Sequence, residues 1–445
     1  MLLRKYGFLA FFVAVAATLS LTSTARAQVG IGNYIGAVGG VSVNPDGVFS
    51  TASKTEASRA LSEFRKQIKD VPSEFNAKGE LRVVSLKRLE AALADALEKG
   101  ETLPDEMLFL AGIQRIEYVF VDDQAHDILL AGPGEAWTYD KECNVVGVTT
   151  GRPVVHLEDL IVALRATFAE QPEAITCSID PTKEGVTRYH QLLARSGKTD
   201  LGAIKRALGM QVITVTGVPA TTRLARVLVS ADYQMKRLAM NLTPAPVKNM
   251  PSYMEMLANS PDLQLEAMPR WWLSCNYEPF ARSEDGLAWR LRGPGVKAET
   301  GEDIYAADGS RIDNGTASPL GQKWADSMTR NYDAISEKMP VFGELRNVMD
   351  LCVISALIRR ENLLAKAGCE LPLLTQASSP LQPTVFPAPK QTPTIVSTVK
   401  RVVQASGGVQ IDAFGVAAKA ETVAQVREVR DGLVAADSKK WWWTK

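Results

Sequence analysis

Histidine is scarce in this sequence, and its scarcity limits the metal chemistry that the protein could perform. Only His126, His156 and His190 occur among 445 residues. No two of them stand four residues apart as in a helical zinc motif, and no CxxC pair accompanies them. We therefore expect no metal site, and we assign each histidine a structural or surface role.

Cysteine is also sparse. The five residues are scattered and odd in number: Cys143, Cys177, Cys275, Cys352 and Cys369. This pattern excludes a disulfide scaffold, although one or two bridges could form in an oxidising compartment, and at least one thiol must be free or paired with another chain. Cys352 lies on the apolar face of a predicted helix, which favours a buried structural thiol.

Neither sign of charge is in excess, because 50 Lys and Arg residues balance 50 Asp and Glu residues. Proteins that bind nucleic acid usually carry a basic surplus, so we expect no nucleic-acid partner. Gly132-Pro133-Gly134 lacks the third glycine and the following helix of a phosphate-binding loop. The sequence therefore predicts no nucleotide and no other cofactor.

Signatures of nucleophilic catalysis are missing as well. The chain has no GxSxG elbow. Cys177 and Ser178 precede His190, but that histidine falls about ten residues into the next predicted helix, which places its ring ~15 Å along the axis. We therefore do not expect these residues to form a catalytic dyad.

Paired carboxylates are the one enzymatic feature that stays open, since a glycosidase needs only two of them about 5 to 10 Å apart. Adjacent acids usually form turns, helix caps or solvated charges instead. The pairs are Asp122-Asp123, Glu158-Asp159 and Glu284-Asp285.

Long apolar runs are confined to the N-terminus. Arg4 and Lys5 precede an apolar run from Phe8 to about Leu21, and Ala25-Arg26-Ala27 resembles a cleavage site. This pattern predicts a signal peptide over residues 1–27; the alternative, an uncleaved anchor, is disfavoured because the run is shorter than the ~20 residues of a spanning helix. We expect a secreted or periplasmic protein with no transmembrane span after cleavage.

The rest of the chain divides by composition, and the division predicts an α+β fold: a mixed sheet with flanking helices, then a β-rich segment closed by two helices and a flexible C-terminal extension. The predicted parts are a Gly-rich segment and surface helix at 28–80, an α/β-type domain at 81–245, a β-rich segment plus helical pair at 246–369, a Pro/Thr/Gln-rich linker at 370–394, and a C-terminal extension with a Trp tail at 395–445.

Several element boundaries rest on particular residues. Ser85 is predicted to cap a helix that Gly100 ends, and Asp180-Pro181 is predicted to begin another helix. The run from Ala225 to Val229 favours a strand. Further strands are expected at 116–121, 127–131, 136–139 and 145–148, and a strand pair around Gly407-Gly408 from 394–403 and 409–417.

Five segments of the sequence resemble one secreted bacterial family, known chiefly from planctomycetes and catalogued as domain of unknown function 1598. The likeness spans about Leu81 to Leu364. It implies no activity, and no catalytic residue is carried over from it. The segments are Cys177-Ser178-Ile179-Asp180-Pro181-Thr182, Ala231-Asp232-Tyr233-Gln234-Met235-Lys236, Asp285-Gly286-Leu287-Ala288, Gly293-Pro294-Gly295-Val296-Lys297 and Pro340-Val341-Phe342-Gly343-Glu344-Leu345-Arg346-Asn347.

Aromatic residues supply the candidate ligand-binding site, because flat rings on a sheet can stack on the faces of sugars. Trp271, Trp272, Tyr277 and Trp289 fall in one β-rich stretch. Alternation along a strand puts Trp271 and Trp272 on opposite faces, so we expect at least one of them in the core.

The C-terminus carries a second candidate site, the triplet Trp441, Trp442 and Trp443. Such a triplet could dock on a membrane interface or on a partner protein, and a disordered tail is the alternative.

The function that these patterns favour is that of a noncatalytic envelope or extracellular component, which binds an envelope glycan or another envelope protein. The sequence leans against an enzyme without excluding one. The alternatives are a hydrolase that acts on envelope polysaccharide or peptide and an assembly module that docks through its Trp-rich tail.

Overall fold

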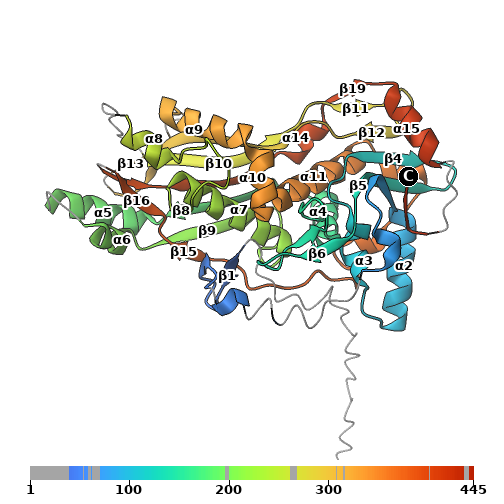
Figure 1. Ribbon diagram of the computed structural model, residues 1–445, viewed down its shortest axis with the longest axis horizontal. Coiled ribbons are helices and arrows are strands. Elements are labelled where there is room, and N and C mark those ends of the chain that lie inside the picture. Colours follow the sequence, from blue (N-terminus) through green and yellow to red (C-terminus); the bar gives the residue numbers. More distant parts are fainter. Residues whose placement is uncertain are drawn as a thin grey trace, which may run out of the picture.

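The strands of the described chain form two seven-stranded sheets (Figure 1). The structure is a computed structural model, and it describes residues 40–53, 55–58, 62, 71–195, 200–260, 268–306, 308–313, 316–399, 401–434 and 440–445. The predicted signal peptide and most of the predicted Gly-rich segment and surface helix lie outside the described residues.

The first sheet has the order β14-β13-β10-β18-β8-β9-β15. Its strands β10 and β18 run parallel, and every other neighbouring pair is antiparallel. The strands are β8 (Ile175–Pro181), β9 (Met210–Thr216), β10 (Met268–Asn276), β13 (Gly295–Tyr305), β14 (Arg311–Asp313), β15 (Gln391–Pro393) and β18 (Ser406–Ile411).

The second sheet has the order β19-β11-β12-β4-β5-β3-β20, and only β11 and β19 run parallel in it. Its strands are β3 (Gly79–Ser85), β4 (Tyr118–Asp122), β5 (Asp127–Gly134), β11 (Phe280–Arg282), β12 (Ala288–Arg290), β19 (Ala420–Thr422) and β20 (Trp442–Thr444). Three two-stranded ribbons accompany the sheets: β1 (Val41–Val43) with β2 (Phe49–Thr51), β6 (Trp137–Tyr139) with β7 (Val145–Gly147), and β16 (Val396–Val399) with β17 (Arg401–Gln404).

Three helices, α4, α7 and α11, pack against one another and join the two sheets into one core (Figure 1). Residues on all sides of α11 are buried, as expected for a helix surrounded by protein. The helices are α2 (Leu86–Lys99), α3 (Asp105–Leu108), α4 (Leu157–Phe168), α5 (Lys183–Arg195), α6 (Leu201–Leu208), α7 (Arg223–Ala239), α8 (Tyr253–Ala258), α9 (Pro319–Arg330), α10 (Tyr332–Lys338), α11 (Pro340–Arg360), α12 (Leu363–Ala367), α13 (Pro372–Thr375), α14 (Ala413–Ala417) and α15 (Gln425–Val434), with short 3-10 turns at Ser73–Phe75 and Leu110–Gly112.

The α+β fold with mixed sheets agrees with the prediction, and so do several local boundaries. The Ser85 hydroxyl accepts a hydrogen bond from the backbone N–H of Arg88 at the start of α2, and Gly100 ends that helix in the left-handed conformation. Cys352 is buried in α11, and all five cysteines are free. Within the described ranges, no helix is both long and apolar enough to cross a membrane.

Two local predictions are wrong. The run from Ala225 to Val229 lies inside α7 rather than in a strand. Over the whole of α7 the apolar residues follow the helical period, but a window of five residues, four of them apolar, does not show that period. Asp180 and Pro181 end β8 in extended conformation, and α5 begins only at Lys183.

The predicted linker and flexible extension are instead built into the sheets. Within 370–394, β15 pairs with β9 at one edge of the first sheet. Within 395–445, β18 lies between β10 and β8, while residues 413–417 form α14 instead of continuing a strand. The described segments of the predicted domains therefore share both sheets.

Candidate functional site

Two of the segments that resemble the DUF1598 family, 177–182 at β8 and 231–236 on α7, meet in the core beneath the first sheet. Lys236 of α7 donates to the backbone carbonyls of Ile179 at 3.1 Å and Gly407 at 3.2 Å, and its ammonium lies 2.8 Å from the Asp232 carboxylate. Both side chains of this ion pair are fully buried. Burial raises the pKa of Asp232 to about 6, against the opposing influence of Lys236. The pair thus anchors α7 to β8 and β18.

Close backbone contact on β18 explains its two adjacent glycines. Gly407 has φ +135°, and a Cβ atom there would lie 1.6 Å from the carbonyl oxygen of Trp271. A Cβ atom at Gly408 would lie 1.8 Å from the carbonyl oxygen of Cys177. Only glycine fits between the neighbouring strands at these positions.

The face of the first sheet that points away from α7 is polar. Along β8, Cys177 and Ile179 are buried under α7, whereas Thr176 and Ser178 point to the opposite face and are partly exposed. Strand register places Trp272, Gly408 and Ser178 side by side on that outer face. A large ring thus stands next to two very small residues, which leaves a depression beside it.

Two hollows meet at this ring, and together we call them the Trp272 groove. One has a volume of ≈ 330 Å³ and the other ≈ 600 Å³, and both are lined by Trp272 and Thr300. The first is also lined by Thr176, Cys177, Ser178, Arg270, Gly301, Glu302, Gly408, Val409 and Gln410, and the second by Lys297, Ala298, Glu299, Gln322, Asp326, Thr329 and Arg330.

Neighbouring side chains fix the orientation of the Trp272 indole. Its Nε1 donates to a carboxylate oxygen of Glu299 at 2.7 Å, and Glu299 also pairs with Lys297 at 2.5 Å. Burial acts to raise the pKa of Glu299, but the Lys297 ammonium and the indole N–H lower it overall. A Cβ atom at Gly301 would lie 3.4 Å from the indole, so the ring lies against this glycine.

Arg270 borders the groove with its charge already neutralised. Its guanidinium lies 2.8 Å from Asp180 and 3.3 Å from the buried Asp303, and the Ser406 hydroxyl donates to Asp303 at 2.7 Å. The arginine thereby ties β10 to β8, β13 and β18 and forms a fixed wall of the groove.

Comparison with known families gave a match that includes most of β8 but not β10, β13 or β18. Residues 177–253 match the family model for a protein of unknown function, DUF1598. The DUF1598 segment contains most of β8, then α5, α6, β9 and α7, and it ends at the start of α8. Comparison with curated proteins and with solved structures gave no match.

The four aromatic residues of the predicted ligand-binding site do not form one surface. Trp271 is fully buried against Tyr253 and Trp324, and Trp289 is buried against Phe280. The partly buried Tyr277 donates its hydroxyl to Asp350 at 2.7 Å. Trp272 lines both hollows of the groove and lies on the face opposite Trp271, as strand alternation predicts.

The C-terminal Trp triplet docks on the chain itself. Trp442 and Trp443 belong to β20, which pairs with β3, and the backbone carbonyl of Trp441 accepts from the N–H of Ser85. The ring of Trp442 is buried and stacked on Phe75 with centroids 4.2 Å apart. In this structure the triplet thus contacts strand β3 and Phe75 of its own chain.

The predicted acid pairs have structural surroundings. Asp122 accepts from the N–H of Ala125 in the β4–β5 turn, and Asp285 accepts from the N–H of Leu287 in the turn before β12. Among the described residues, no group of three or more His, Cys, Asp and Glu side chains is arranged to hold a metal ion.

The remaining acid pair, Glu158 and Asp159, is buried. Such pairs were expected to form turns, helix caps or solvated charges. Arg223, at the start of α7 in the DUF1598 segment, pairs with Asp159 on α4 and with Glu344 on α11. Burial and the adjacent Asp159 raise the pKa of Glu158 to about 8, and burial raises that of Glu344 to about 7. The cluster joins the three central helices. No local pattern predicts that acids on different helices share one arginine, because their contact depends on how the helices pack.

Glu158 should make the stability of the protein fall as the pH rises. Its pKa is raised above the ordinary value of 4.5, so the protonated form favours folding, and this contribution is lost as the pH passes through about 8. Glu158→Gln is expected to reduce the loss of unfolding free energy between pH 5 and pH 9 in urea titrations. The exposed Glu98→Gln is the matched control; an equal pH profile for both variants would contradict the assignment.

Proposed function

We propose that this chain is a noncatalytic binding protein of the cell envelope or extracellular space that holds a carbohydrate chain in the Trp272 groove. The observation that carries the proposal is the partly exposed indole of Trp272, fixed by Glu299 and bordered by glycines and by hydroxyl and amide side chains. The secreted or periplasmic location rests on the predicted signal peptide, residues 1–27, and on nothing in the described part of the chain.

Stacking accounts for the aromatic part of such a site. The C–H groups of a pyranose face are apolar and weakly positive, and they pack against the negative face of an aromatic ring. Because Gly301 and Gly408 flank the indole on neighbouring strands, no side chain from these positions competes for the space beside it. A sugar ring is flat enough to enter such a depression.

Hydroxyl recognition would come from the polar side chains of the outer sheet face. Thr176, Ser178 and Gln410 line the first hollow on this face, and they offer donors and acceptors at different positions beside the indole. Ligand sites commonly combine one large apolar contact with a few polar groups that fix orientation. This composition favours a neutral, hydroxyl-rich ligand over a strongly charged one.

The charge state of the groove favours binding over hydrolysis. A glycosidase needs one carboxyl group with a raised pKa that can protonate the leaving oxygen. The pKa of Glu299 is instead lowered, and its carboxylate is held by Lys297 and Trp272. The arrangement supports a ligand that is retained rather than cleaved.

Replacement of Trp272 tests this proposal. An array of envelope glycans and peptidoglycan fragments would first select a ligand, and titration calorimetry would then measure its affinity. Trp272→Ala is expected to weaken binding about tenfold, since an aromatic contact contributes ~0.5–1.5 kcal/mol beyond its buried area. Trp272→Phe, which keeps a ring, should retain part of the affinity.

Phe414→Ala is the matched control, because Phe414 is an exposed aromatic residue on α14 that lines neither hollow. Equal affinity in wild type and Trp272→Ala would reject the groove as the binding site. Release of shorter glycans during the assay would favour the alternative hydrolase.

A further inference from the structure

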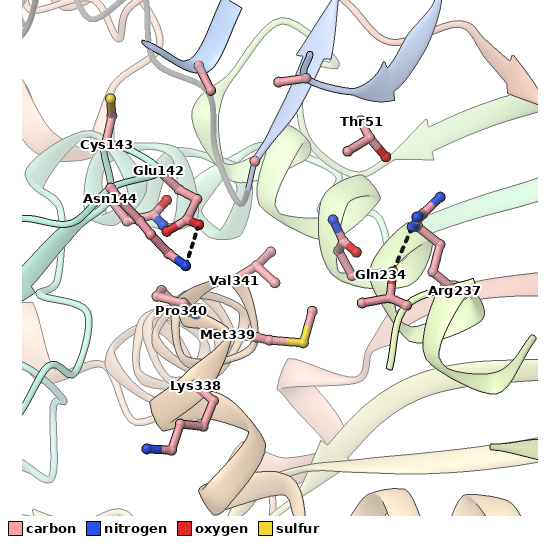
Figure 2. A pocket seen from close by; sticks show the side chains of 15 residues that line it. Thr51, Glu142, Cys143, Asn144, Gln234, Arg237, Lys338, Met339, Pro340 and Val341 are labelled. Atoms are coloured by element: carbon pink, nitrogen blue, oxygen red, sulfur yellow. Dashed lines mark hydrogen bonds and ion pairs between the residues drawn. The ribbon is translucent and has the colours of Figure 1, made fainter. Parts of the chain in front are cut away.

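Another hollow lies apart from the two that form the Trp272 groove and shares no lining residue with them. It has a volume of ≈ 360 Å³, in the range of small-molecule sites. Its walls come from the β1–β2 ribbon, the loop between β6 and β7, helix α7 and the junction of α10 with α11. Figure 2 shows these segments around the cavity.

Apolar side chains form one side of this cavity. Met339, Pro340 and Val341 stand at the junction of α10 and α11, and Ala52 follows strand β2. In Figure 2 the side chains of Met339 and Val341 lie between the Glu142 side and the α7 side of the cavity. Such a surface suits the hydrocarbon part of a ligand.

Polar groups from the DUF1598 segment form the opposite side. Gln234 and Arg237 of α7 line the cavity, on the opposite side of the helix from Lys236, which holds the sheet. Arg237 donates from Nε to the Thr243 hydroxyl and from Nη2 to the carbonyl of Leu242, both at 3.0 Å. These two bonds fix the orientation of the guanidinium. Among the described residues, Nη1 has no hydrogen-bond partner, so it can donate to a ligand.

The charges around the cavity are unequal. Lys141, Arg237 and Lys338 bring three positive charges, and Glu142 brings one negative charge. Lys141 lies 3.4 Å from Glu142, so these two largely cancel. Arg237 and the exposed Lys338 are left as the net positive charge of the site. An anionic head group would be attracted to them.

We propose that this cavity binds a small amphiphilic anion, a monocarboxylate with an unbranched apolar body of about eight carbon atoms. At ~30 Å³ per water-sized group, the cavity holds about a dozen non-hydrogen atoms, and octanoate has about ten. The hydrocarbon chain would lie against Met339 and Val341 with the carboxylate at Arg237, and the exposed Lys338 would add positive charge at another part of the lining. The site is independent of the proposed glycan groove.

Three probes with the same number of carbon atoms separate the contributions of head-group charge and hydrocarbon chain to the binding affinity. In titration calorimetry of the purified chain, octanoate is expected to bind at one saturable site and octanol at least tenfold more weakly. Octylamine is expected to show no saturable binding. Octanol binding as tightly as octanoate, tighter binding of octylamine, or no saturable binding of any probe would overturn the proposal.

Variants then locate the site. Lys338→Glu is expected to weaken octanoate at least tenfold and to gain affinity for octylamine, whereas Lys323→Glu, at an exposed lysine of α9, should change neither. Ala52→Trp should fill the cavity and abolish octanoate binding. Equal effects of the two lysine variants, or unchanged binding in Ala52→Trp, would place the ligand elsewhere. Trp272→Ala should leave octanoate binding unchanged, which separates this test from that of the glycan groove.

Discussion

Replacing Lys236 by methionine is expected to lower the free energy of unfolding by about 3–5 kcal/mol, because the Asp232 carboxylate would lose its cation inside the core. The carbonyls of Ile179 and Gly407 would lose their donor as well. Since the pKa of Asp232 is already raised to about 6, protonation relieves part of the cost, and the loss should be larger at pH 8 than at pH 5. Urea denaturation at both pH values measures it.

Two controls distinguish burial of the charge from loss of the side chain. Asp232→Leu combined with Lys236→Met removes both charges and should recover much of the stability. Lys99→Met breaks the exposed pair with Asp95, which has the same spacing of four residues, and should change stability little. If Lys236→Met is no worse than Lys99→Met, the buried pair does not hold α7 to the sheet.

Gly407→Ala is the second substitution for which a large effect is expected. The added Cβ atom would overlap the carbonyl oxygen of Trp271 and force the strands apart, and φ +135° disfavours any L side chain. Together these effects should lower the free energy of unfolding by ~3–5 kcal/mol, measured by calorimetry or urea denaturation.

Gly100→Ala provides the comparison for Gly407→Ala. Gly100 also has a positive φ, +64°, but nothing lies within 4 Å of the added Cβ atom. Its loss should therefore reflect backbone strain alone, about 1–2 kcal/mol. If both variants lose the same free energy of unfolding, the close strand packing at Gly407 does not add to the cost of the substitution.

Local elements could be predicted from the sequence because their causes are local. Ser85 and Gly100 bound α2 through bonds within a few residues, and β4 and β5 are apolar runs that a short turn joins into a hairpin. The interpretation failed for Ala225 to Val229, since the partners that bury α7 on most sides lie far away in the chain. Burial of this kind is a tertiary effect that a short window cannot show.

The candidate site was predictable only in part. Alternation indicates that Trp271 and Trp272 face opposite ways, but which of them enters the core depends on α8 and α9, which supply Tyr253 and Trp324. The outer side of the groove also needs Gln410, which is brought to β8 and β10 by the late strand β18. No spacing in the sequence relates these segments to one another.

The central position of β18 has a consequence for biosynthesis. Strands β8 and β10 are complete by Asn276, yet each forms hydrogen bonds with β18, residues 406–411, which lies between them in the sheet. The first sheet therefore closes only after residues 406–411 have been synthesised, and this long-range pairing is expected to slow folding. Until then the edges of β8 and β10 that will face β18 have unpaired backbone groups, which makes the incomplete sheet prone to pair with other chains.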